Sequence, residues 1–256
     1  MREFEGKVIL ITGAAGSIGS SAARSFAEAG AKLALLDLSE EALETAAADI
    51  NTEKLLLTAD MTIEAEMERA VQATVDRFGR IDVFINQAGI SGDFLPLTEQ
   101  TVESMEQVLQ TNVVGAFIAL KHVLRVMIKQ RSGAVVNGAC SGSLLGGPGM
   151  STYVASKHAL LGLNKTAALE VSEYGIRVNA VCPSALDTGW MEDIESKAAK
   201  GNEKTARSGF EASVPLNRYG TVEEVTGLML FLASDRASFI TGSYFRVDGG
   251  QGTTSV

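Results

Sequence analysis

Short apolar runs alternate with longer amphipathic stretches along the chain, and this alternation narrows the possible folds sharply. Most of the runs are continuously apolar, as in strands whose two faces are both buried in a parallel sheet. We expect strands at Val8–Ile11, Leu33–Leu36, Leu55–Leu57, Ile81–Ile85, Ala134–Val136, Ile176–Val181 and Tyr244–Val247. We expect helices at Ile18–Ala29, Glu40–Ile50, Glu64–Phe78, Val102–Lys129, Tyr153–Glu173 and Val222–Ala233. Strand–helix–strand repetition predicts an α/β fold in three layers, a doubly wound parallel sheet of about seven strands flanked by helices.

No linker, internal repeat or low-complexity tract interrupts this pattern, so we predict a single domain over residues 1–256. A hydrophobic fraction of 46% and a charged fraction of 21% are typical of a folded protein. The polar, irregular stretch 187–214 follows the carboxyl end of a strand, where open-sheet proteins place ligand loops. We predict a substrate lid there, and the alternative is a plain surface excursion.

Charge and residue usage exclude several classes of function. The net charge is −9 without a basic stripe, which argues against nucleic-acid binding. Cys140 and Cys182 are isolated, and neither His122 nor His158 has ligand spacing to them, so we expect no disulfide scaffold and no metal site. No apolar run approaches ~18 residues, so no membrane span is expected. The first seven residues do not form a secretory signal, and we expect a cytoplasmic protein.

A glycine-rich turn, TGAAGSIG at 12–19, joins the first predicted strand to the first predicted helix. Such a turn lets backbone amides approach a pyrophosphate at a helix N-terminus, as in a Rossmann-like fold. Asp37 ends the second strand 24 residues after Gly13, where a carboxylate accepts hydrogen bonds from a ribose diol and repels a 2′-phosphate. With no Arg or Lys in the turn or directly after Asp37, we predict NAD rather than NADP as the cofactor.

Two further strand ends belong to the predicted cofactor site. Asp60 either bonds an adenine amino group or caps the helix that starts near Thr62. The segment 86–89 ends the fourth strand with small residues that let backbone pack beside a ribose. The predicted cofactor contacts up to this point in the chain are Gly13, Gly16, Ser17, Ile18, Gly19, Asp37, Leu38, Asp60, Met61, Asn86, Ala88 and Gly89.

Tyr153 and Lys157 are four residues apart in a predicted helix and therefore share one helix face. A free tyrosine has a pKa near ~10, and a neighbouring ammonium favours the phenolate, so we expect Lys157 to lower the pKa of Tyr153. The pair would then pass a proton to or from a substrate oxygen while a hydride moves to or from a nicotinamide.

Together these motifs resemble the short-chain dehydrogenase/reductase family, the compact branch with single-domain chains, over essentially the whole sequence. The resemblance rests on Thr12-Gly13-x-x-Gly16-x-x-Gly19, Asp60, Asn86-Gln87-Ala88-Gly89, Asn112, Tyr153-x-x-x-Lys157, and Pro183 with Thr188. It implies that Tyr153 is the proton donor or acceptor, that Lys157 bonds the nicotinamide ribose and tunes the tyrosine, and that Asn112 supports the lysine through a water. It also implies that Leu186 and Thr188 contact the nicotinamide carboxamide, with Pro183 beside them.

The chain departs from the family pattern at four positions. Ser17 stands where the family usually has glycine, Gln87 replaces the second asparagine of a pair, and Ser184 replaces the glycine of a Pro-Gly pair. The fourth departure concerns the serine that the family places 13 positions before the tyrosine, which here is Cys140. A thiol is a weak hydrogen-bond donor. Three interpretations follow: Ser141 or Ser143 polarises the substrate oxygen instead, Cys140 does so at a reduced rate, or the protein is catalytically weak.

The predicted substrate side is mainly apolar. We expect the pocket wall to include Phe94, Leu95, Leu144, Leu145, Trp190 and Met191. No Arg clamp for a carboxylate is apparent, which favours a neutral secondary alcohol or ketone. One basic cluster, Lys121, Arg125, Lys129 and Arg131, either docks an acidic carrier with a 3-oxoacyl chain or is a solvated helix face.

The leading hypothesis is an NAD(H)-dependent oxidoreductase of secondary alcohols and ketones that acts on a small molecule. The first alternative is a dinucleotide-binding protein without efficient catalysis. The second is a 3-oxoacyl reductase, which is expected to use NADPH, and the carboxylate of Asp37 argues against that cofactor. The family resemblance also implies a homotetramer, with interfaces at helices 102–129 and 153–173 and at the C-terminal segment near 248–250.

Overall fold

A seven-stranded sheet with every strand parallel forms the centre of the structure, a computed structural model that describes residues 2–199 and 203–253. The strands are β1 (Val8–Thr12), β2 (Lys32–Asp37), β3 (Lys54–Thr58), β4 (Val83–Asn86), β5 (Gly133–Gly138), β6 (Ile176–Pro183) and β7 (Tyr244–Val247). Their order is β3-β2-β1-β4-β5-β6-β7, so the winding direction reverses between β1 and β4. The predicted doubly wound α/β fold is therefore confirmed.

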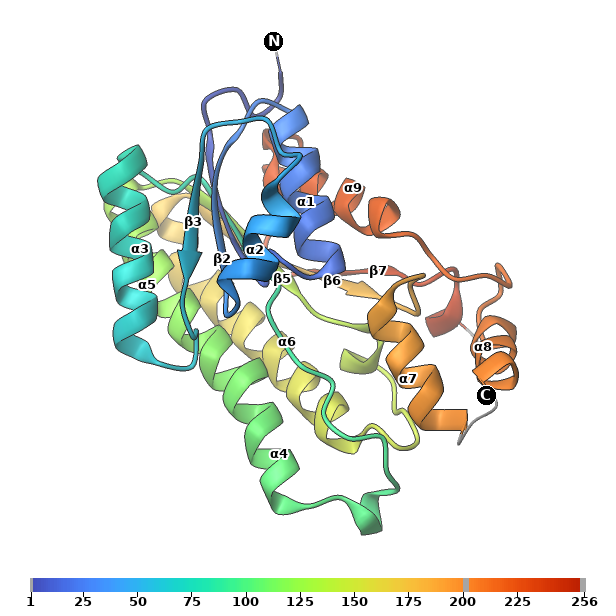
Figure 1. The fold of residues 1–256 in the computed structure, drawn as a ribbon. Helices are drawn as coiled ribbons and strands as arrows, with labels where there is room; N and C mark the ends of the chain where they lie inside the picture. Colours follow the sequence, from blue (N-terminus) through green and yellow to red (C-terminus); the bar gives the residue numbers. More distant parts are fainter. Residues whose placement is uncertain (1, 200–202, 254–256) are drawn as a thin grey trace.

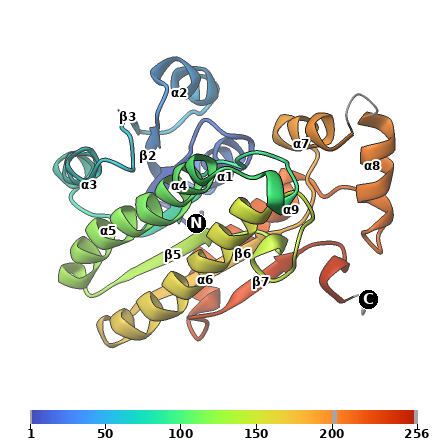
Figure 2. The same ribbon diagram turned by 90° about the horizontal axis from the view of Figure 1, so that it is seen from below.

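Helices cover both faces of this sheet, as Figures 1 and 2 show. They are α1 (Ser17–Glu28), α2 (Glu40–Ala47), α3 (Glu64–Phe78), α4 (Val102–Leu109), α5 (Ala116–Gln130), α6 (Ser151–Val171), α7 (Gly189–Ala199), α8 (Glu203–Ala212) and α9 (Val222–Ala233). One core joins the sheet to α1, α2 and α9, and a second core joins its other face to α3, α5 and α6. Ile9 and Ile11 of β1 enter one core and Leu10 enters the other, which explains why the strand is continuously apolar.

The stretch predicted as one helix over Val102–Lys129 contains an irregularity. A π-helical segment, Gln110–Gly115, separates α4 from α5 and carries Asn112. Such widened turns are rare and concentrate at functional sites. The sequence gives no periodic signal for this change of pitch.

The same stretch, Val102–Gln130, is long and apolar enough to cross a membrane by length and composition, with a mean hydropathy of 1.4 in its most apolar window. Half of that window is buried inside the fold, where α5 packs on the sheet with α3 and α6. A core helix of a folded domain has this same composition, and the packing places Val102–Gln130 in that group.

The segment 187–214 is helical rather than irregular. It contains α7 and α8, apart from residues 200–202, which lie outside the described part of the chain. Met191 and Ile194 of α7 are buried against Tyr219 in a small third core. Both helices are rich in charged residues, so their narrow apolar face gives no clear helical pattern in the sequence.

Candidate active site

The strands end at one edge of the sheet, and a cavity of about 790 Å³ opens there beside β1 and β4. A crevice outside the carboxyl ends of strands, at the point where the strand order reverses, is the usual ligand site of such a sheet. The turn after β1 forms one wall, and the ends of β2, β4 and β6 form the others. The predicted residues that line it are Gly13, Gly16, Ser17, Ile18, Gly19, Asp37, Leu38, Asp60, Met61, Ala88, Gly89, Cys140, Tyr153, Lys157, Pro183, Leu186 and Thr188.

The glycine turn brings backbone close to backbone in a way that larger residues would block. Gly13 has a φ of 67°, and a Cβ there would lie 2.8 Å from the Cα of Ala88. A Cβ on Gly19 would collide with the carbonyl oxygen of Gly13. Gly16 is the N-cap of α1 and supplies no side-chain hydrogen bond to the first turn. The amides of that turn therefore remain for a phosphate, so the turn fits the pyrophosphate of a dinucleotide.

Asp37 is held rigidly at the rim of this cavity. Its Oδ2 accepts a hydrogen bond from the amide of Ala15 at 2.9 Å, and its Oδ1 accepts one from the amide of Leu38 at 2.8 Å. Each carboxylate oxygen keeps further acceptor capacity for a ribose hydroxyl. The fixed negative charge also disfavours a 2′-phosphate, so the site fits NAD better than NADP.

Asp60 orders the turn before α3, which is one of its two predicted roles. Its Oδ1 accepts hydrogen bonds from the amide and the hydroxyl of Thr62, both at 2.8 Å, and thereby orders the turn before α3. Among the described residues its Oδ2 accepts no hydrogen bond, and Asp60 lines the cofactor cavity. The turn-ordering role is seen directly, and the adenine contact stays a prediction.

Asn86 lies inside the sheet rather than on the cavity, in contrast to the prediction. Its Nδ2 donates to Oδ1 of Asn137 at 3.0 Å, and Nδ2 of Asn137 donates to Oδ1 of Asn164 at 3.0 Å. The hydroxyl of Thr12 bonds Asn86 at 3.5 Å and also accepts from the amide of Gln87 at 3.1 Å. This buried amide ladder ties β1, β4, β5 and α6 together behind the cofactor cavity.

Tyr153 and Lys157 lie on α6 and both reach the cavity from its floor. The Nζ of Lys157 is 5.7 Å from the centre of the Tyr153 ring and donates to the carbonyl oxygen of Gly138 at 2.7 Å. Lys157 is buried, and this is its one hydrogen bond among the described residues. An ammonium has three donors. Its remaining donors fit the ribose hydroxyls of a nicotinamide nucleotide.

Burial sets the protonation of both groups. The pKa of Tyr153 is raised well above its ordinary value of 10, chiefly by burial and further by its interaction with the neighbouring Cys140 side chain. The pKa of Lys157 is lowered, chiefly by burial. The predicted lowering of the tyrosine pKa is therefore wrong for the protein chain by itself. Tyr153 is a neutral phenol that can donate a proton.

The structure separates the three candidates for the oxygen-polarising group. Cys140 lines both the cofactor cavity and the adjoining pocket, and Tyr153 lines both as well. Ser141 lines the substrate pocket alone, with its Oγ 3.9 Å from the Cys140 Sγ. Ser143 is buried, and its Oγ accepts a hydrogen bond from the amide of Cys140 at 3.2 Å. Ser143 therefore shapes the turn and does not face the substrate.

Asn112 acts on the backbone of the cavity wall. Its Oδ1 accepts from the amide of Ile90 at 2.8 Å, and its Nδ2 donates to the Ile90 carbonyl at 2.9 Å and to the Ser156 hydroxyl at 3.0 Å. The π-helical segment turns its side chain inward to make these bonds. Asn112 thus joins the segment after β4 to α6, and its support of Lys157 through a water stays a prediction.

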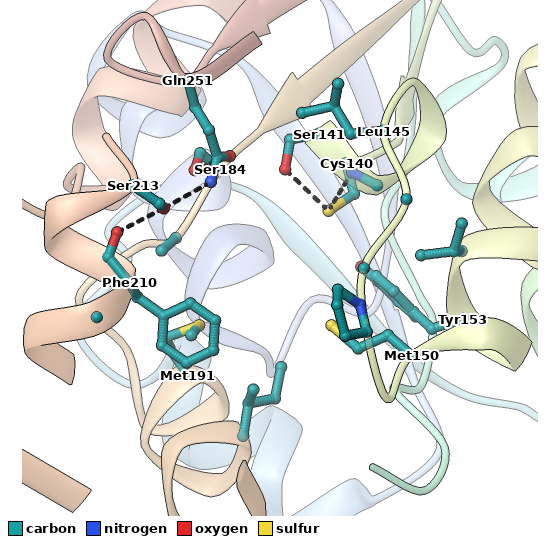
Figure 3. Close-up of a pocket in the computed structure, with 18 of the residues that line it drawn as sticks. Cys140, Ser141, Leu145, Met150, Tyr153, Ser184, Met191, Phe210, Ser213 and Gln251 are labelled. Carbon is teal, nitrogen blue, oxygen red and sulfur yellow. Dashed lines mark hydrogen bonds between the residues drawn. The ribbon is translucent and has the colours of Figure 1, made fainter. Parts of the chain in front are cut away.

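A second cavity of about 680 Å³ adjoins the first, and Figure 3 shows the residues that line it. Cys140, Tyr153, Ser184 and Trp190 line both cavities, so they lie where the two cavities meet. The Trp190 ring stands 5.5 Å from the Tyr153 ring, centre to centre. The described lining residues include no charged side chain, which fits a neutral substrate.

Half of the predicted pocket wall is correct. Leu145, Trp190 and Met191 line the substrate pocket. Leu144 turns away and packs on the core beneath α6, whereas Phe94 packs behind the wall against the third core. The backbone amide of Leu95 donates to the Gly149 carbonyl at 3.0 Å, and Leu95 does not line the pocket. The residues that the sequence analysis missed include Met150, Val154, Ile194, Ala206, Phe210, Ser213 and Gln251, and three of these are on the helices of 187–214.

Comparisons with known proteins agree with this geometry. A family model described as enoyl-(acyl carrier protein) reductase matches residues 13–251. The chain is 39% identical over 253 residues to levodione reductase of Leifsonia aquatica, covering 97% of this chain and 95% of that protein. It is 39% identical over 252 residues to 3-oxoacyl-[acyl-carrier-protein] reductase FabG of Thermotoga maritima, covering 96% and 98%. The crystal structure of NAD+-bound xylitol dehydrogenase superposes with a TM-score of 0.95 at 39% identity, covering 97% of this chain and 100% of that one.

The fold and its paired cavities define an oxidoreductase built on a dinucleotide-binding sheet. The chain belongs to the short-chain dehydrogenase/reductase family. It is accordingly an enzyme that acts on alcohol and ketone groups, and its cofactor is NAD.

Proposed function

We propose that the enzyme interconverts a neutral secondary alcohol and the corresponding ketone, with Tyr153 as the general acid and base. The observation that carries this proposal is the junction of the two cavities, where the buried phenol of Tyr153 meets an uncharged pocket. The related proteins are named for levodione and xylitol, two different compounds, so the relatives do not decide between substrates.

The protein's own groups supply positioning and proton transfer. NAD, when bound, supplies the hydride acceptor, and its reduced form supplies the hydride donor. In reduction Tyr153 donates its proton to the carbonyl oxygen, and in oxidation the phenolate takes the proton from the hydroxyl. Lys157 holds its ammonium beside the ring and favours the phenolate once the proton has left. The apolar side chains around Tyr153 exclude water from this exchange.

Cys140 is our proposal for the group that orients the substrate oxygen. It lies at the junction of the cavities, and its Sγ already accepts a hydrogen bond from the amide of Gly142 at 3.4 Å, which fixes its position. Its thiol proton can point to the substrate oxygen beside the Tyr153 hydroxyl. A thiol donates weakly, so we expect catalysis below what a hydroxyl would give.

The decisive test is Tyr153→Phe, which removes the phenol and keeps the ring that packs near Trp190. We expect alcohol oxidation, followed as NADH formation, to fall at least 10²-fold, while the dissociation constant for NADH stays within a few-fold of native. Tyr174→Phe is the matched control, because it makes the same chemical change at a tyrosine that lines neither cavity. Full turnover in Tyr153→Phe contradicts the proposed mechanism.

A 3-oxoacyl reductase is the weaker alternative. One relative carries that name, but the expected NADPH is opposed by the fixed carboxylate of Asp37. In the basic cluster, Lys121 is already paired with Glu64, and the guanidinium of Arg131 lies over the ring of Tyr174. These partners reduce the charge left for an acidic carrier.

We further propose that 187–214 acts as a lid over the substrate. Trp190, Met191 and Ile194 of α7 line the pocket together with Ala206 and Phe210 of α8, and Phe210 packs against the cluster of Met191 and Ile194. Outward movement of these helices would admit substrate, and their return would exclude water from Tyr153. Protection of this segment from proteolysis by NADH with a substrate analogue tests the proposal, and equal cleavage with and without ligands contradicts it.

We also propose the homotetramer and the cytoplasmic location expected from the sequence. Three apolar side chains are exposed on the outer face of the helical layer: Val114, Phe117 of α5 and Leu169 of α6. Leu169 is 83% exposed, so covering it by a second copy removes apolar surface from water. Light scattering of native protein and of Leu169→Glu tests this: four chains are expected for the native protein and fewer for the variant.

A further inference from the structure

One departure from the family pattern, Ser184, places a hydroxyl at the junction of the two cavities. Ser184 follows the end of β6, and its amide donates to the carbonyl of Val247 at 3.1 Å, so its backbone is fixed by the last strand. A glycine at this position would present no polar side chain to the substrate. Ser184 adds a hydroxyl to the same pocket that Cys140 and Tyr153 line.

Ser184 begins a chain of hydrogen bonds along that side of the pocket, drawn in Figure 3. Its Oγ donates to Oε1 of Gln251 at 2.8 Å, and Nε2 of Gln251 donates to Oγ of Ser213 at 2.9 Å. The Ser213 hydroxyl in turn donates to the carbonyl of Phe210 at 2.7 Å. These hydrogen bonds therefore link the end of β6, the C-terminal segment and the end of α8.

The direction of these bonds determines which ligand group they suit. A hydroxyl has one proton and two lone pairs. Ser184 uses its proton on Gln251 and Ser213 uses its proton on Phe210, so both oxygens keep acceptor capacity toward the pocket. An acceptor in an otherwise apolar and uncharged wall is matched by a hydroxyl group of a ligand.

Figure 3 shows how this group lies relative to the reacting residues. Ser184, Ser213 and Gln251 stand on one side of the pocket, with Cys140, Ser141 and Tyr153 on the other. A substrate whose reacting oxygen is at Tyr153 therefore directs its far side toward Ser184. Apolar side chains line the rest of the pocket, Met191 and Phe210 among them, and would contact its carbon skeleton.

We propose that Ser184, positioned by Gln251 and Ser213, is a specificity-determining residue that binds a second, non-reacting hydroxyl of the substrate. The inference rests on the proposed function and narrows it to compounds with two uncharged oxygens, namely diols and hydroxyketones. The enzyme then prefers a diol over the corresponding mono-alcohol, because the mono-alcohol leaves the Ser184 acceptor without a partner in a dry pocket.

The test compares cyclohexane-1,4-diol, whose second hydroxyl is on the far side of the ring, with cyclohexanol in native protein, Ser184→Ala and Ser184→Gly. We expect the native kcat/KM to favour the diol about five- to tenfold, the value of one net hydrogen bond, and both variants to reduce this ratio to about one. Ser172→Ala is the matched control, since its hydroxyl bonds Ala168 at the end of α6 and lines neither cavity. Its ratio should equal the native ratio.

A binding measurement separates this inference from the proposed function. Each compound is titrated into the protein–NADH complex, with NADH fluorescence as the readout, which requires no turnover. Preferential diol binding that Ser184→Ala abolishes supports the inference even when neither compound is oxidised, an outcome that contradicts only the proposed chemistry. A native preference near one, or a preference that both Ser184 variants retain, overturns the inference.

Discussion

Replacing Cys140 by serine should make the enzyme faster. The thiol stands at the junction of the cavities, which Tyr153 also lines and where we propose that the substrate oxygen binds. A well-placed hydrogen-bond donor is worth ~2.7–4 kcal/mol in a transition state of this kind. A thiol supplies part of that value, so a hydroxyl should lower the barrier by a further ~1–2 kcal/mol, or about 5- to 30-fold in kcat. Serine can also accept the Gly142 amide that now bonds the sulfur, so the turn is retained.

The assay is NADH formation from a secondary alcohol at saturating NAD, with native protein, Cys140→Ser, Cys140→Ala and Ser141→Ala in parallel. We expect kcat to rise in Cys140→Ser, to fall in Cys140→Ala and to change little in Ser141→Ala. Cys140→Ala should also shift the pH profile for oxidation to lower pH, because Cys140 contributes to the raised pKa of Tyr153. Burial is the larger cause of that raised pKa and remains in every variant.

Two outcomes would refute this reasoning. A serine variant no faster than native protein shows that the thiol is not the limiting donor. A large loss in Ser141→Ala with little change at Cys140 assigns the donor to Ser141, which faces the same pocket 3.9 Å from the sulfur. The dissociation constant for NADH should be the same throughout, which distinguishes effects on chemistry from damage to the fold.

Three further predictions concern the cofactor rim, the lid and the helix after it. Asp37→Asn removes a charge that repels a 2′-phosphate by ~1–4 kcal/mol, so the ratio of kcat/KM for NADP to that for NAD should rise at least about fivefold. An unchanged ratio places the discrimination elsewhere. Tyr219→Phe leaves the buried carboxylate of Glu195 without the hydroxyl that bonds it at 2.7 Å, so urea unfolding should show a loss of ~1–3 kcal/mol, against none if the carboxylate finds another donor. The pKa of Glu224 is lowered to about 2 by its bonds to Arg218 and to the cap of α9, so its stabilising effect is complete above pH 4.5 and is lost as the pH falls toward 2. Melting temperatures should therefore fall less between pH 5 and pH 3 in Glu224→Gln than in native protein, and parallel curves would contradict this.

Much of the fold was predictable because local and global signals agree. The strands are continuously apolar because helices cover both faces, and this pattern is visible in the sequence. Ser39 caps α2 by accepting from the amide of Ala42, and Thr221 with Glu224 forms a capping box at α9. Gly79 ends α3 with a φ of 81°. Each of these residue types strongly favours a helix end, so their positions in the sequence were enough to predict where the helices begin and end.

The cofactor side of the site was predictable for the same reason, since the turn at 12–19 and Asp37 act through backbone geometry and charge. The substrate side was not. Gln251 and Ser184 are 67 residues apart, and nothing in either neighbourhood indicates that they bond. The pKa of Tyr153 was also misjudged, because helix spacing reveals the nearby Lys157 but not the burial that outweighs it.

The strand order also has a consequence for how the newly made chain acquires its structure. β1 can pair with β2 early in synthesis, but its other edge stays open until β4 has been made. Pairing partners so distant in sequence slow folding, and the exposed edge is vulnerable to association with other chains. The described residues that line the cofactor cavity are complete at Trp190, whereas the substrate pocket needs Gln251, near the end. On the ribosome the dinucleotide site is therefore complete first, and binding of the cofactor can stabilise the unfinished domain before a substrate has anywhere to bind.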